Sequence, residues 1–180
     1  MPNGIEISSD VGPIVELVGL LHSEGARAHS FARLRSQQAR CQAATEQYAK
    51  QLDRLYYDIA RSGHNADWLV QAADLVRQRE EEQRERLRPG IEVLKDKLAA
   101  QRVSVDAEAR RLIEESIAVG ETWLSLPAAL HNKLLQLADE RRATAEEIRR
   151  ARPVHGKIDY TKLSREHLAR YPQIRAALVK

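Results

Sequence analysis

Cysteine is almost absent from this chain of 180 residues. Cys41 is the only one, so no disulfide can form within the chain and nothing points to an oxidising compartment. A single cysteine also excludes a zinc ribbon, and no two of the six histidines lie three or four residues apart, the spacing of paired ligands on a helix. We therefore expect neither a metal site nor a cofactor.

Glycine, proline and aromatic residues are also scarce. The chain has 8 Gly and 6 Pro, and aromatic residues make up 4% of it, whereas charged residues make up 31%. The remaining composition is led by Ala, Leu, Glu and Arg, which all favour helix. We predict an all-α fold, an elongated bundle of five to seven helices.

No long apolar run is present. The longest stretch, residues 11–21, is broken by Gly12, Pro13 and Glu16 and is too short to span a bilayer. It also lacks the basic flank and cleavage site of a secretory signal. We therefore expect a cytoplasmic protein that does not contact a membrane, and its excess of Arg over Lys is typical of a GC-rich bacterial genome.

Within that stretch the pattern predicts a first helix. Ile14, Leu17, Val18 and Leu21 follow the i, i+3, i+4, i+7 spacing of one helix face. Pro13 fits the first turn, where the missing N–H costs little.

The strongest pattern in the sequence is a heptad repeat that continues for more than four heptads. Ser62 and Gly63 mark its end, and Asn65 is the predicted N-cap of the next helix, so one helix should cover about residues 26–61. The seam of this helix consists of alternate steps of three and four residues: Phe31, Leu34, Gln38, Cys41, Thr45, Tyr48, Leu52, Leu55 and Ile59.

The length of this helix determines the expected shape. About 36 residues make a helix about 54 Å long, whereas a compact chain of this size has a diameter of about 40 Å. The helix should therefore form a long antiparallel coiled-coil pair, and the segment 67–88 is its nearest partner in sequence. Pro89 and Gly90 then predict either a kink or a reversal, and both remain open. Gly120 predicts the end of a later helix and Pro127 the start of another.

Three parts of the chain differ in composition. Residues 1–10 lack periodicity and read as a flexible leader, residues 11–152 as the helical body, and residues 153–180 as a short basic helical appendage. Residues 141–180 hold 11 Lys or Arg against 4 Asp or Glu. Such asymmetry fits an acidic partner, and it also fits a solvated helix face.

No catalytic signature is present. The chain has no glycine-flanked serine, phosphate-binding glycine loop or dinucleotide fingerprint, and Cys41 lies at a seam position, where thiols are commonly buried and inert. We expect a non-enzymatic coiled-coil protein that mediates protein–protein interaction, either by self-association or by docking a partner helix. The predicted contact residues are Phe31, Leu34, Cys41, Tyr48, Leu52, Leu55 and Ile59.

The alternative is a nucleic-acid-binding regulator. Its helical body would dimerise, and its basic region would bind phosphates, with affinity that falls steeply with salt. The candidate contact residues are spread over the last forty positions: Arg141, Arg149, Arg150, Arg152, Lys157, Lys162, Arg165 and Arg170.

Overall fold

The protein is a bundle of α-helices. A computed structural model describes residues 11–23, 31–100 and 107–151. These residues form four helices and no strand: α1 (Gly12–Ser23), α2 (Phe31–Arg61), α3 (Ala66–Ala100) and α4 (Ala107–Ala151). The all-α fold predicted from composition is confirmed, while the leader and the appendage lie outside the described residues.

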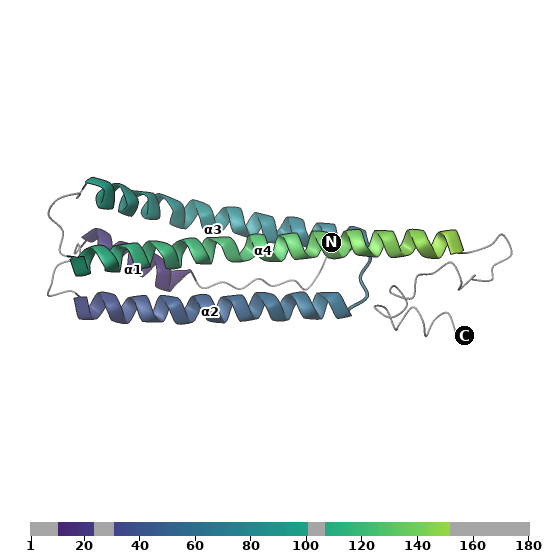
Figure 1. Ribbon diagram of the computed structural model, residues 1–180, viewed down its shortest axis with the longest axis horizontal. Coiled ribbons are helices and arrows are strands. Elements are labelled where there is room, and N and C mark those ends of the chain that lie inside the picture. The colour runs from purple at the N-terminus through teal and green to yellow at the C-terminus, as the bar shows by residue number, and fades with distance from the viewer. Residues whose placement is uncertain (1–10, 24–30, 101–106, 152–180) are drawn as a thin grey trace.

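The long helices lie side by side in an elongated bundle (Figure 1). α4 has 45 residues, which corresponds to about 68 Å. α3 runs antiparallel to α4 in Figure 1 and packs against it more extensively than any other two helices pack. A long antiparallel pair is therefore present, but α3 and α4 form it, whereas the sequence patterns paired residues 26–61 with residues 67–88. α2 packs along α4 and meets α3 where Gln83 Nε2 donates to the Tyr48 hydroxyl at 3.4 Å.

The turn between α2 and α3 follows its sequence signals. The Ser62 N–H donates to the Asp58 and Ile59 carbonyls, at 3.1 and 3.2 Å, as α2 ends. Gly63 has φ 73°, a left-handed conformation that glycine adopts without strain. Asn65 Oδ1 accepts a hydrogen bond from the Trp68 N–H at 2.9 Å, which is N-cap geometry. Both the predicted stop and the predicted cap are confirmed.

Other predicted helix boundaries are wrong. α3 continues through Pro89 and Gly90, so the chain does not reverse there, and α4 continues through Gly120 and Pro127. A helix-interior glycine costs about 1 kcal/mol and a proline about 3 kcal/mol. Large side chains that are buried before and after these glycines and prolines offset that cost. They include Leu87 and Ile91 in α3 and Trp123 and Leu130 in α4. The described residues consequently form four helices, with no helix end at Gly120 or Pro127.

Two of these glycines also allow close packing. A Cβ atom at Gly90 would lie 2.5 Å from Val18 Cγ1 of α1, and one at Gly120 would lie 2.8 Å from Ile91 Cδ1 of α3. Both distances are shorter than van der Waals contact. Glycine therefore brings α1 onto α3 and α3 onto α4. The local sequence left Gly90 open as a kink or a reversal and predicted a helix end at Gly120, because it does not show this packing role.

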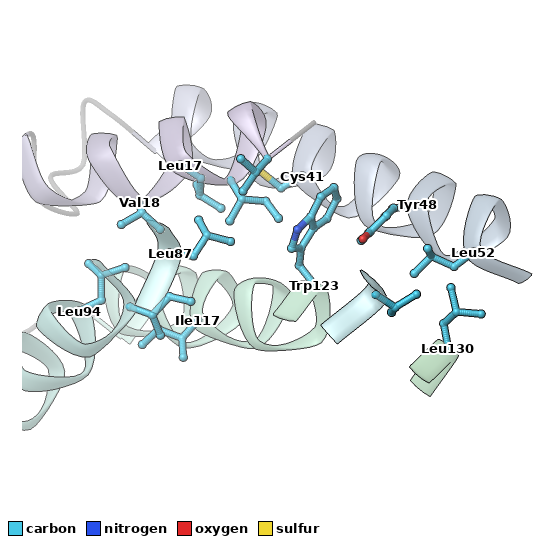
Figure 2. Close-up of a cluster of buried hydrophobic side chains, with 14 of the residues drawn as sticks. Leu17, Val18, Cys41, Tyr48, Leu52, Leu87, Leu94, Ile117, Trp123 and Leu130 are labelled. Atoms are coloured by element: carbon cyan, nitrogen blue, oxygen red, sulfur yellow. The ribbon is translucent and has the colours of Figure 1, made fainter. Parts of the chain in front are cut away.

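The two ends of the bundle differ in thickness. α1 has 12 residues and α2 has 31, so α1 covers less than half the length of α2. At the α1 end Leu17 and Val18 pack with Leu87 and Leu94 (Figure 2). Beyond the end of α1, the rings of Tyr48 and Trp123 stack with centroids 4.5 Å apart. The bundle therefore has four helices at one end and three at the other, joined by one continuous core.

We predict that Gly90→Ala destabilises the protein although alanine is the better helix former. The new methyl group would overlap Val18, a stiff β-branched side chain, and overpacking of this kind outweighs the gain in helix propensity by about 1 to 2 kcal/mol. Urea unfolding followed by circular dichroism measures the change.

Gly19→Ala is the matched control, because a Cβ atom there meets no atom within 4 Å. It should leave stability unchanged or raise it by up to about 1 kcal/mol. Val18→Ala should relieve the effect of Gly90→Ala in the double variant. A Gly90→Ala protein as stable as the wild type would contradict this account of the close approach.

Candidate functional site

The seam of α2 lies in the core of the chain itself. Most of its members are buried, whereas Phe31, Gln38 and Leu55 are partly exposed. α1 and α4 cover this face of α2. A partner could reach the seam only after α1 or α4 moved away, so partner contact by these residues stays a prediction. The buried members are, in chain order, Leu34, Cys41, Thr45, Tyr48, Leu52 and Ile59.

Polar groups of α2 hold the first turn of α1. Gln37 Nε2 donates to the Pro13 carbonyl at 3.0 Å and to Glu16 Oε2 at 3.1 Å, and the Cys41 thiol donates to the same carbonyl at 2.9 Å. The heptad pattern places Gln38 in the seam, but the buried glutamine is Gln37, which is 6% exposed. No pattern in the sequence distinguishes these adjacent glutamines, because the choice depends on where α1 lies.

Cys41 has the properties of an inert thiol. Its side chain is fully buried, and burial raises its pKa to about 11, with the negative charge of Glu16 as a second cause. Because the thiolate is the nucleophile, a thiol that keeps its proton at neutral pH reacts slowly.

Beside the face that contacts α1, α2 borders an open groove together with α4. This groove, called here the α2–α4 groove, has a volume of about 590 Å³. A second hollow of about 580 Å³ adjoins it towards Ala107, and both include Gln38 and Glu115. Residues 115–126 of α4 run along the groove for about 17 Å. Its lining is formed by ten residues of two helices: Gln38, Gln42, Thr45, Glu46, Ala49, Glu115, Ala118, Val119, Thr122 and Leu126.

The α2–α4 groove combines a small, partly apolar surface with negative charge. Its charged lining residues are Glu46 and Glu115, with no Lys or Arg. Arg111 Nε donates to Glu115 at 2.6 Å and Gln38 Nε2 donates at 2.8 Å, and these two bonds, Arg111 first, lower the pKa of that carboxyl group. Glu46 makes no hydrogen bond or ion pair with any described residue.

The sequence patterns did not predict this groove. Gln38 and Thr45 are polar members of the heptad seam, and the other signal is the small size of Ala49, Ala118 and Thr122. That signal acquires meaning only when α2 and α4 are known to be neighbours.

Three of the predicted basic contact residues lie within the described part. Arg141 is half-buried, and its Nη2 donates to the Ala60 carbonyl at 2.9 Å, so it caps the end of α2. Arg149 and Arg150 are 76% and 75% exposed, and both pair with Glu146. The structure therefore gives Arg141 a structural role. The other five lie outside the described residues: Arg152, Lys157, Lys162, Arg165 and Arg170.

Residues 11–23, 31–100 and 107–151 contain no group of three or more His, Cys, Asp or Glu side chains that could hold a metal ion. None of α1 to α4 is long and apolar enough to cross a membrane. No protein-family model, curated protein or solved structure gives a significant match to this chain.

We predict that Cys41 reacts very slowly with a thiol reagent in the folded protein. A pKa of about 11 in place of 9.0 lowers the thiolate fraction at pH 8 by about 100-fold, and α1 also blocks access. The absorbance change of an aromatic disulfide reagent gives the reaction rate of the folded protein. The same measurement in urea gives the rate of the unfolded chain. The Gly90→Ala variant should react faster than Gly19→Ala, and rapid labelling of the folded wild type would contradict the position of α1.

The same thiol predicts a pH dependence of stability. Because its folded pKa lies above its unfolded value, the unfolded chain loses this proton first as pH rises from 9 to 11. The contribution of Cys41 to stability is therefore complete below pH 9 and declines through that range. Urea midpoints of wild type and Cys41→Ala, measured from pH 7 to 11, should show a steeper decline in the wild type. Parallel curves would contradict it.

Proposed function

We propose that this protein is a non-enzymatic helical interaction protein that binds a helix of a protein partner in the α2–α4 groove. The observation that supports the proposal most is the groove itself, which follows two neighbouring helices for about three turns. A surface that two helices border lengthwise suits a third helix.

The lining indicates the chemistry of that helix. Val119 and Leu126 offer apolar contact, and Ala49 and Ala118 leave room for the partner to approach closely. Glu46 and Glu115 are its charged residues, and Glu115 is paired with Arg111 while Glu46 has no ion pair with a described residue. An amphipathic helix with small or aliphatic residues on one face and Lys or Arg beside them would complement this surface.

The covered seam supports the choice of this surface. Its large side chains, such as Leu34 and Tyr48, already complete the core within one chain. Binding through the seam would require the chain to give up contacts of α1, including two hydrogen bonds to the Pro13 carbonyl. Binding in the groove requires no such loss.

A nucleic-acid role is the second candidate, because Arg149 and Arg150 expose three quarters of their side chains at the end of α4. Glu146 pairs with both and reduces the local positive charge. Binding by this route would weaken steeply between low and high salt, whereas binding in the groove, which combines apolar contact with two carboxylates, would weaken less.

We predict that Ala118→Arg weakens partner binding by more than about tenfold, because it fills the groove and opposes a basic partner helix. Ala43→Arg is the control, since Ala43 is also an exposed helical alanine but does not line the groove. The immobilised full chain would capture proteins from a lysate of its source. The most enriched protein would then be purified and its Kd measured against wild type and both variants.

Light scattering and absorbance at 260 and 280 nm on the purified chain come first, because they distinguish a second copy and bound nucleic acid from a different protein. Equal affinity of wild type and Ala118→Arg would rule out the groove as the binding site. A salt-sensitive complex with nucleic acid that both variants retain would favour the second candidate.

A further inference from the structure

The α2–α4 groove contains a carboxylate without a partner among the described residues and an apolar lining that no described helix covers. Glu46 has no partner among the described residues, and Glu115 stays ionised beside Arg111. Ala118 and Thr122 are exposed although they belong to a partly apolar lining. A covering helix with basic residues would bury the apolar part and pair with Glu46.

The last residues of the chain have this chemistry. After Pro172, Ile174, Ala177 and Leu178 follow the i, i+3, i+4 spacing of one helix face, and Arg175 and Lys180 are the charged residues of the same stretch. Residues 173–180 contain no Asp or Glu. Their pattern is therefore the complement of the groove lining.

The length of the chain beyond α4 decides which segment can reach the groove. Leu126, at the near end of the groove, lies 25 helical residues before Ala151, a distance of about 38 Å. An extended chain spans at most about 3.5 Å per residue, so the basic residues 152–160 are too close to the end of α4 to reach it. Residues 152–172 can cross that distance even if half of them are helical.

We propose that the C-terminal segment 173–180 of the same chain occupies the α2–α4 groove and acts as a latch that a partner helix must displace. The inference rests on the proposed function in taking the groove as a helix-binding surface, but it does not depend on which partner binds. By helical spacing, Arg175 and Lys180 flank the face of Ile174, Ala177 and Leu178 on opposite sides. One of the two cations would therefore face Glu46, while the three apolar residues cover the apolar part of the groove.

Disulfide trapping in the full chain tests the latch directly. One double variant carries Ala118→Cys and Ala177→Cys, and its control carries Ala43→Cys and Ala177→Cys, because Ala43 is exposed on another face of α2. Cys41 is buried and should not compete. Oxidation is followed on a non-reducing gel, with light scattering to assign each band as monomer or dimer.

The latch predicts an intramolecular disulfide that forms at least about tenfold faster in the groove variant than in the control, because docking raises the local concentration of residue 177. Equal rates in the two variants would overturn it, since a segment that never docks meets both positions. A disulfide that joins two chains would assign the groove to a second copy, and no disulfide would also overturn the latch.

These results are separable from the proposed function, because trapping uses the isolated chain and partner binding is measured with a second protein. Failure of the latch leaves the groove open to a partner. Failure of Ala118→Arg to weaken partner binding leaves the trapping result unchanged.

Discussion

The continuity of α4 through Gly120 and Pro127 is the constraint on which the rest of the structure depends. One face of this helix places Trp123, Leu130 and Leu134 in the core, and another places Ala118, Thr122 and Leu126 along the groove. Had the helix ended at Gly120, as its local sequence indicates, the stacked Tyr48 and Trp123 rings and the lining of the groove would both be lost. Core packing therefore stabilises the same helix that shapes the exposed surface.

The short helix α1 determines which faces of α2 stay accessible. It packs close to α3 at Gly90, and Gln37 and Cys41 bond to its first turn. These contacts turn the seam of α2 into core, so a pattern that usually marks a coiled-coil interface here connects helices of one chain. The adjoining flank, which carries Gln38 and Gln42, borders the α2–α4 groove instead.

Sequence patterns predicted the features that depend on local chemistry. The heptads of α2, the Asn65 cap, the Gly63 stop and the apolar face of α1 all appear in the structure. The breaks at Gly120 and Pro127 were wrong because tertiary burial offset local helix propensity. The pairing of α3 with α4 and the α2–α4 groove could not be predicted, since both depend on which helices become neighbours. The basic surface was predicted as one region, yet Arg141 caps α2 while Arg149 and Arg150 remain exposed.

The central claim is that the folded chain binds a helix between α2 and α4, on a surface that its own last residues can also cover. Amide hydrogen exchange on the full chain, with and without a bound partner, tests this most directly. The account predicts slower exchange in residues 38–49 and 115–126 on binding, with α1 unchanged. Slower exchange confined to residues 141–151, or faster exchange in α1 as the partner binds the seam, would contradict it.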